Sequence, residues 1–376
     1  MADRSTFDVA VVGLGAAGSA ALQALARSGK RVVGIDQYDP PHALGSSHGE
    51  TRLLRTAYFE GAFYIPLVKR AITLWKRLER ETGAKLFEQT GVTYAGPAAG
   101  PFMAGTLASA RKKQVALRPA RGMARWFEIG ERWPAVTDVA GGYVYPERAI
   151  GAFLGSAFRN GATIHADCRC DAIDTSGKAI VLHTAHGPTA AKALVVTTGA
   201  WITELIPELA PLATVERRVL HWFADPKRKF TRKAGFLPFA ISNAEGKFLY
   251  GFPANAKGEV KVAEHLSVEV IASPDRLNRK VNRADKAAID MLVAQMMPNL
   301  GKRLRSAVCM YPMMPDERFL LARYPRDRRI VIGAGLSGHG FKFAPAIGEV
   351  LANLALRRKQ AVPIGKFGWP LKGDGA

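Results

Sequence analysis

The chain has 376 residues, of which 48% are hydrophobic and 37 are glycine. This length and composition fit two globular domains, each with its own core, and argue against a disordered chain. No stretch approaches the roughly 18 consecutive apolar residues of a membrane helix, and the first residues lead into a strand without an apolar leader. Three cysteines are too few for a disulfide framework, so we expect a soluble protein of the reducing cytoplasm.

Basic residues outnumber acidic ones, with 53 Lys and Arg against 32 Asp and Glu and a formal net charge of +21. Such a charge attracts anions and is compatible with non-specific nucleic-acid contact. The basic residues are scattered in short groups, without a basic tail or a recognisable nucleic-acid motif. We interpret them as solvated surface charge that also steers an acidic substrate, with nucleic-acid binding as the alternative. We predict no specific nucleic-acid partner and no membrane association.

The N-terminal segment predicts a strand, a helix and a second strand. Phe7 to Val12 is a short apolar, β-branched run, typical of a buried parallel strand. Small and apolar residues from Ala16 to Arg27 favour a helix, and Gly29 is placed to end it in the left-handed conformation. Arg31 to Asp36 supplies the second strand and completes a βαβ unit.

The rest of the chain alternates between helical and strand-like patterns. A Pro/Gly/Ser/His-rich loop covers Asp39 to Gly49, and an amphipathic helix is predicted from Leu67 to Arg80. Further elements are strands at 193–201, 219–223, 248–252, 260–262 and 330–335 and a last helix at 346–356.

These elements predict an α/β fold with a discontinuous Rossmann-type nucleotide-binding domain and an α+β substrate domain whose sheet is mostly antiparallel. The nucleotide-binding domain is assigned to residues 1–85, 144–216 and 306–376. The substrate domain, inserted into the first, is assigned to residues 86–143 and 217–305.

A glycine turn follows the first strand. In Gly13-x-Gly15-x-x-Gly18 the first glycine allows the tight turn, the second lets the backbone approach a pyrophosphate, and the third lets helix pack on strand. The following helix presents free N–H groups to the anion, and Asp36 closes the second strand where it can accept hydrogen bonds from ribose hydroxyls. The combination predicts dinucleotide binding, and a glycine turn needed only for packing is the alternative.

Two arginines and a histidine stand close together in the next loop, in His48-Gly-x-Thr-Arg52-x-x-Arg55. By chemistry alone they form a candidate anion site. A surface loop with ordinary salt bridges is the alternative.

Two later segments also carry reactive groups. Cys309 stands alone in apolar surroundings, the usual setting of a buried small hydrophobic residue. Four glycines between Gly333 and Gly340 let the backbone crowd a ligand, and Lys342 follows them. The helix that comes next would point its N-terminal dipole at that ligand, and a solvated lysine is the alternative for Lys342.

In this order and at these separations, the four segments resemble the family of monomeric sarcosine oxidase and N-methyl-tryptophan oxidase, within the D-amino-acid-oxidase-like FAD enzymes. The resemblance runs from about Phe7 to Leu356, and the blocks around Arg52 and Lys342 are its most specific part. It implies a monomer whose Rossmann-type domain holds FAD, linked covalently through Cys309. The implied reaction oxidises a small anionic secondary amine, an N-methyl amino acid, to an imine that gives amino acid and formaldehyde, while molecular oxygen becomes hydrogen peroxide.

The resemblance also implies roles for single residues. Arg55 and Lys342 would clamp the substrate carboxylate, and Lys261 over the flavin would stabilise the charge that develops as oxygen is reduced. The residues implied in catalysis, at the substrate or the flavin ring, are Lys261, Arg52, His48, His265, Tyr250 and Tyr311. The expected cofactor contacts are Gly13, Gly15, Gly18, Asp36, Gly199, Trp201, Cys309, Gly338, Gly340 and Lys342.

Some positions depart from the family's pattern. Glu264 stands where relatives carry a bulkier uncharged residue, and Ala322 replaces an aspartate, so the substrate side chain stays open. Cys168 and Cys170 have no catalytic partner in the sequence and are interpreted as structural, and no metal site is predicted. Two alternative functions remain: an oxidase of a cyclic imino acid such as pipecolate or proline, and a non-catalytic basic flavin-binding protein.

Overall fold

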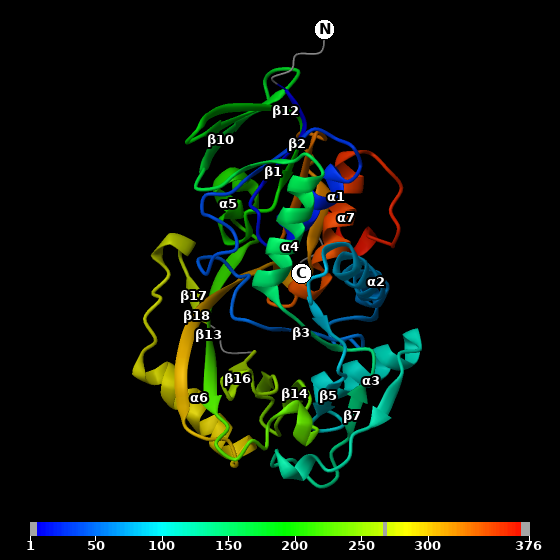
Figure 1. The fold of residues 1–376 in the computed structure, drawn as a ribbon, viewed down its shortest axis with the longest axis vertical. Helices are drawn as coiled ribbons and strands as arrows, with labels where there is room; N and C mark the ends of the chain where they lie inside the picture. Colours follow the sequence, from blue (N-terminus) through cyan, green and yellow to red (C-terminus); the bar gives the residue numbers. More distant parts are fainter. Residues whose placement is uncertain (1–5, 266–268, 370–376) are drawn as a thin grey trace.

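The computed structural model describes residues 6–265 and 269–369, which form two large sheets, a small third sheet and their covering helices (Figure 1). Residues 1–5, on which the expected leaderless start depends, lie outside the described residues. In the described ranges, no helix is long and apolar enough to cross a membrane.

The first sheet has eight strands in the described residues, in the order β10-β11-β12-β1-β2-β9, with β20 beside β12 and β19 beside β20. The strands β20, β12, β1, β2 and β9 pair in parallel, as the βαβ prediction requires. The strand bounds are β1 (Phe7–Val12), β2 (Val32–Ile35), β9 (Thr163–His165), β10 (Cys170–Asp174), β11 (Ile180–Thr184), β12 (Gly187–Val196), β19 (Leu320–Arg323) and β20 (Ile330–Ala334).

Helices cover both faces of this sheet because β1 is apolar on both sides. Val9 and Val11 pack into the core formed with α1, α2, α4 and α7, whereas Ala10 and Val12 pack into the core on the opposite face, which includes α5. The upper part of Figure 1 shows α1, α4 and α7 grouped beside β1 and β2. The helix bounds are α1 (Ala16–Ala26), α2 (Ile65–Thr82), α4 (Pro146–Arg159), α5 (Ile202–Leu205) and α7 (Ala344–Ala355).

The helices predicted from sequence are confirmed with small shifts at their ends. The first ends one residue before the predicted Arg27, and Gly29 has the expected left-handed conformation with φ of +73°. The amphipathic helix extends two residues beyond the prediction at each end. The last helix begins at Ala344, with Pro345 in its first turn, where the missing N–H of proline costs no hydrogen bond.

The second sheet has nine strands in the described residues and is mostly antiparallel, as predicted; the pair β14–β5 is parallel. The predicted strands at 219–223, 248–252 and 260–262 correspond to β13, β15 and β16. Its strands are β5 (Val92–Ala95), β6 (Leu117–Pro119), β7 (Ala135–Asp138), β13 (Thr214–Ala224), β14 (Phe239–Ser242), β15 (Phe248–Gly251), β16 (Glu259–Glu264), β17 (Val270–Ile271) and β18 (Arg303–Met313).

The remaining elements flank the second sheet or connect the two. Helices α3 (Pro101–Lys113) and α6 (Arg283–Met296) lie at the lower right and lower left of Figure 1. The three-stranded sheet is formed by β3 (Arg52–Leu54), β4 (Phe87–Glu88) and β8 (Gly142–Val144). The residue limits given above for the two domains stay a prediction. Strand pairing places β18, most of which belongs to the 306–376 range, in the second sheet.

Candidate functional site

The turn between β1 and α1 is shaped by its three glycines. Gly13 has φ of +86°, and a Cβ added to Gly18 would lie 1.7 Å from the carbonyl oxygen of Gly13, so both positions exclude a side chain. At Gly15 the nearest atom to an added Cβ is Ser47 Oγ at 3.6 Å. The space beside Gly15 is therefore open, at the N-terminus of α1, where backbone N–H groups favour an anion.

Asp36 follows β2 and is fixed by the same turn. Its Oδ2 accepts a hydrogen bond from the Leu14 N–H at 2.6 Å, and its Oδ1 accepts one from the Tyr38 N–H at 3.0 Å. A carboxylate has about four acceptor positions, so it can still accept hydrogen bonds from hydroxyls in the cavity that it lines.

One cavity extends from this turn to the space between the two large sheets. We call the part lined by Gly13, Gly15 and Asp36 the glycine end, and the part lined by Arg52, Arg55 and Lys342 the cationic end. The predicted residues that line the cavity are Gly13, Gly15, Asp36, Gly199, Trp201, Arg52, Arg55, Tyr250, His265, Tyr311, Gly338, Gly340 and Lys342. The predicted residues behind this lining are Gly18, His48, Lys261 and Cys309.

A half-buried arginine, Arg52, and a buried lysine, Lys261, lie near Cys309 at the cationic end. Arg52 Nη1 donates to the Thr51 carbonyl at 3.0 Å, and its Nη2 lies 3.8 Å from the Cys309 sulfur. Lys261 Nζ donates to the carbonyl oxygens of Gly49 and Thr51, both at 2.6 Å. Burial, together with the charge of Arg52, holds the pKa of Lys261 well below its usual range. Two basic side chains are thus gathered next to a fully buried thiol.

Lys342 is a buried cation with only 4% of its surface exposed. Its Nζ donates to the Tyr58 hydroxyl at 2.8 Å and to the His339 carbonyl at 2.5 Å. Within residues 6–265 and 269–369, no ion pair joins Lys342 to a carboxylate. Burial and the nearby charge of Arg55 lower the pKa of Lys342 well below its usual range. An anion bound here would favour the charged form of Lys342 and offset the free-energy cost of burying it.

Arg55 lies against the same Tyr58 ring as Lys342. Its Cζ is 4.8 Å from the centre of the Tyr58 ring, and Lys342 Nζ is 5.0 Å from the same ring. Arg55 Nη2 forms an ion pair with Glu60, while Nη1 has no hydrogen-bond partner among the described residues. A small anion at this end would meet an unpaired ammonium and an unpaired guanidinium N–H.

Aromatic and neutral imidazole groups complete the wall of the cationic end. The hydroxyls of Tyr250 and Tyr311 are hydrogen bonded to each other, and the His265 ring centre lies 5.8 Å from that of Tyr311. Burial lowers the pKa of His265 to about 3, and burial together with Arg52 lowers the pKa of His48 to about 3. Both imidazoles are therefore neutral near pH 7.

The family model for FAD dependent oxidoreductases matches residues 8–354 of this chain. The chain belongs to this family. The monomeric sarcosine oxidase of Bacillus sp. (strain B-0618) is 36% identical over 377 residues, which cover 96% of this chain and 95% of that protein. The N-methyl-L-tryptophan oxidase of Yersinia pestis (strain Pestoides F) is 34% identical, over 96% of this chain and 98% of that one. The solved structure of NikD, an amino acid oxidase essential for nikkomycin biosynthesis, matches the fold with a TM-score of 0.83, at 22% identity and over 97% of each chain.

The cavity of this FAD dependent oxidoreductase fits its cofactor on three observations. The open space at Gly15 adjoins the N-terminus of α1, where a pyrophosphate would be held by backbone N–H groups. Asp36 retains acceptor capacity toward a ribose. Gly338 and Gly340 line the far end just before α7, whose N-terminal dipole favours electron density on a ring placed there.

Sequence reasoning missed residues that position the predicted cations. Tyr58 and Glu60 hold Lys342 and Arg55, respectively, and both follow Arg55 within five residues, so local spacing alone was a usable signal. His339 lies between Gly338 and Gly340 in the glycine-rich segment, and its contact with Lys342 through the backbone carbonyl was not foreseen.

Arg218 was missed entirely. It lies on β13 opposite Cys309, its Cζ is 4.9 Å from the Tyr311 ring centre, and it forms an ion pair with Glu216. Its Nε and Nη1 have no hydrogen-bond partner among the described residues. No spacing rule in the sequence brings β13 next to β18, so only the sheet register reveals it.

The departure at Glu264 has a structural explanation. Its carboxylate forms an ion pair with Lys247 at 3.3 Å. The negative charge beside His265 is therefore compensated by a lysine in the connection between β14 and β15. Ala322 lies on β19, at the edge of the first sheet, where it packs against the core; nothing in the structure explains its choice over an acidic residue.

Proposed function

We propose that this enzyme oxidises a small secondary amine that carries a carboxylate, of the N-methyl amino acid class to which sarcosine belongs. The observation that carries the proposal is Lys342, a buried ammonium without a carboxylate partner in the described chain, next to Arg55 with a free N–H. Burying a cation without a counter-ion is costly, and a substrate carboxylate would supply the missing charge. The names of the two oxidases described above support an amino-acid substrate.

The same cations also favour the reactive form of the amine. A free electron pair on nitrogen is needed for oxidation, and positive charge from Arg52, Arg55, Lys261 and Lys342 disfavours a bound ammonium ion. Neutral His265 adds no charge and can hydrogen bond to the amine. We therefore expect the substrate to bind by its carboxylate and to lose its amine proton to solvent on binding.

FAD held in this cavity would supply the two-electron oxidation of the N-methyl carbon, the carbon that leaves as formaldehyde. The imine product then reacts with water to give a primary amino acid and formaldehyde. Lys261, beside Arg52, is proposed to stabilise the negative charge that develops on oxygen as it is reduced to hydrogen peroxide.

Cys309 is proposed to hold the flavin covalently, as a thioether between its sulfur and a carbon of the ring. Its place at the cationic end, with the Arg52 guanidinium 3.8 Å from the sulfur, supports this assignment. Forming the thioether removes two hydrogen atoms, which oxygen takes up as hydrogen peroxide. We expect the yellow colour to stay with the polypeptide after acid precipitation and the flavin peptide to contain Cys309, and Cys309→Ser to lose this retention.

The substrate class is tested by hydrogen peroxide release from a panel of amines with the purified flavoprotein. N-methyl amino acids are expected to yield one formaldehyde for each hydrogen peroxide, with primary amino acids as the matched negative controls. Faster turnover of pipecolate or proline, without formaldehyde, would replace this proposal by cyclic imino acid oxidation. Full flavin content with no peroxide from any of these amines would indicate a non-catalytic flavin-binding protein.

A further inference from the structure

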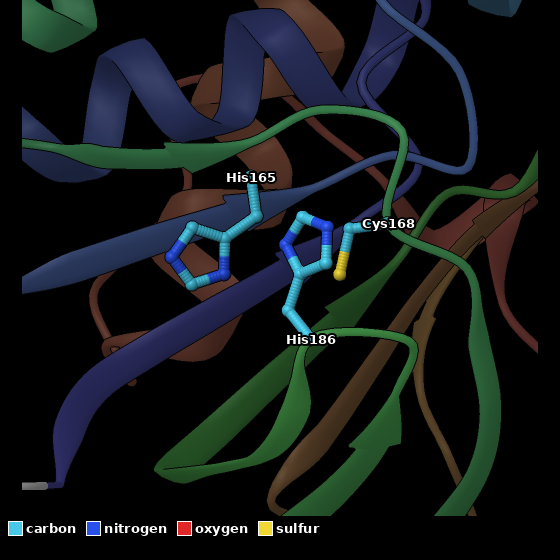
Figure 2. Close-up of side chains that lie close together, drawn as sticks. All are labelled: His165, Cys168 and His186. Atoms are coloured by element: carbon cyan, nitrogen blue, oxygen red, sulfur yellow. The ribbon is translucent and has the colours of Figure 1, made fainter.

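Three side chains of metal-ligating types meet beside the glycine end, and of the three only Cys168 also lines the cavity. They are His165 at the end of β9, Cys168 in the loop that follows, and His186 in the turn between β11 and β12 (Figure 2). Figure 2 shows the three side chains gathered from two segments, with the His186 ring next to the Cys168 sulfur. The sequence analysis predicted no metal and assigned Cys168 only a structural role.

The backbone of these segments is held by hydrogen bonds. The Asp36 N–H donates to the His165 carbonyl at 3.0 Å, and the Cys168 N–H donates to the Asp36 carbonyl at 2.8 Å. The Ala185 N–H donates to the Arg169 carbonyl at 2.9 Å, which fixes the turn carrying His186 over the Cys168 loop. The three side chains are therefore brought together by the fold and not by chance rotation of a loose loop.

The donor atoms have the chemistry and the spacing of a metal site. One nitrogen from each histidine and the Cys168 sulfur all lie within 4.8 Å of one another. A tetrahedral ion with metal–sulfur and metal–nitrogen bonds of about 2.3 and 2.1 Å needs donor separations of roughly 3.5 Å. Since His186 is exposed, rotation of its side chain can bring its nitrogen to the shorter separation that the ion needs.

Two of the three donors are available for a ligand. His165 Nδ1 is buried and has no hydrogen-bond partner in the described part of the chain. Cys168 is a free cysteine that is fully buried. An orphaned buried nitrogen is uncommon in folded proteins and points to an absent partner.

We propose that His165, Cys168 and His186 bind one divalent ion of the zinc class, with water in the fourth position on the exposed side of His186. Imidazole and thiolate together select zinc or its analogue cobalt over magnesium or calcium. Binding converts the Cys168 thiol to a thiolate and releases its proton to solvent. No redox change is involved, and the site does not depend on the identity of the amine substrate.

The ion would tie the β9 end and the β11–β12 turn together beside Asp36. Because Cys168 also lines the cavity, this clamp would rigidify the wall of the glycine end. An ion that binds only the folded chain raises its stability, and an excess of about 100 times its dissociation constant is expected to raise Tm by roughly 5 °C.

The test uses the full-length flavoprotein, treated with a chelator, desalted and titrated with Co²⁺. We expect one cobalt per chain, with tetrahedral d–d bands to the red of the flavin absorption and a sulfur-to-cobalt charge-transfer band. His186→Ala is expected to weaken binding at least about tenfold, and Cys168→Ser to abolish the charge-transfer band. Metal analysis after gel filtration and Tm in the presence of Zn²⁺ provide readouts that do not require activity.

Matched controls lie close by in the chain. His183→Ala removes an exposed histidine from β11, and Cys170→Ser removes the neighbouring thiol; both should bind cobalt as the unchanged chain does. The proposal is overturned if the unchanged chain retains no cobalt, if His186→Ala binds it equally well, or if the controls lose as much affinity. His186 lies in an exposed turn, so its variant is expected to fold even if Cys168→Ser does not.

Discussion

The glycine end and the cationic end of the cavity are built in different ways. The glycine end comes from one continuous segment, Gly13 to Asp36, and acts through backbone shape: an open space, free N–H groups and a carboxylate held by two backbone N–H groups. The cationic end assembles Arg52, Lys261 and Lys342 from distant segments and acts through buried charge. Changes at the first end should therefore affect non-covalent binding of the cofactor, and changes to the cations of the second end should affect the substrate and oxygen.

Lys342→Met gives the largest expected effect. Losing a buried charge-assisted contact to the substrate carboxylate should lower kcat/KM by roughly 10²- to 10³-fold, measured by peroxide release. Because the unpaired buried ammonium is removed, Tm should not fall and the flavin content should stay the same. Lys366→Met, at an exposed lysine, is the control. A large loss of flavin in Lys342→Met would contradict the division of roles between the glycine end and the cations of the cationic end.

Lys261→Met is expected to slow reoxidation of the reduced flavin by oxygen about 100-fold, since a preorganised charge next to the reacting oxygen is removed. Anaerobic reduction by substrate, followed by stopped-flow absorbance, should change far less. Lys257→Met, at an exposed lysine in the adjacent turn, should alter neither half-reaction. Equal slowing of both half-reactions would mean that Lys261 acts on the cationic end as a whole and has no specific role in oxygen reduction.

Gly15→Ala probes the glycine end. The protein itself has room for the added methyl group, whose nearest neighbour is Ser47 Oγ at 3.6 Å, but the methyl would occupy the space offered to the pyrophosphate. We expect the dissociation constant for FAD, measured by reconstitution of the apoprotein, to rise at least about tenfold, a cost of about 1.4 kcal/mol, while Tm of the apoprotein stays within a few degrees. Unfolding of the apoprotein would instead mean that Gly15 serves packing.

The pH dependence of carboxylate binding gives the smallest effect. The pKa of Lys342 in the free protein is lowered by burial and by Arg55, and a bound carboxylate favours the charged form. Affinity for propionate should therefore fall as pH rises through the lowered pKa, by up to about tenfold per pH unit. Flavin absorbance titrations between about pH 6.5 and 10 measure it, and Lys342→Met should flatten the profile. An affinity that rises with pH would show that another group controls binding.

Much of the fold was predictable because its signals are local. The apolar run of β1, the glycine turn and Asp36 lie within 30 residues, and hydrogen bonding within that unit fixes their geometry. Strand runs such as 219–223 also appeared where expected, although the ends of helices shifted by one or two residues. Arg52 and Arg55 stand out as a candidate anion site by their chemistry, but the roles of Lys261 and Lys342 come from a resemblance, since nothing local in the sequence distinguishes a buried lysine from a solvated one.

The sequence by itself determined the nucleotide-binding unit, the alternation of helices and strands, and the identity of the residues available for chemistry. Only the tertiary structure decided which of those residues are buried and what they meet: Lys342 held by Tyr58, Arg218 placed opposite Cys309 by strand register, and His186 brought to His165 and Cys168. The physical reason is that burial and charge pairing depend on contacts between segments far apart in the chain. Spacing along the chain does not encode such contacts, whereas a turn or a helix is encoded by its own residues.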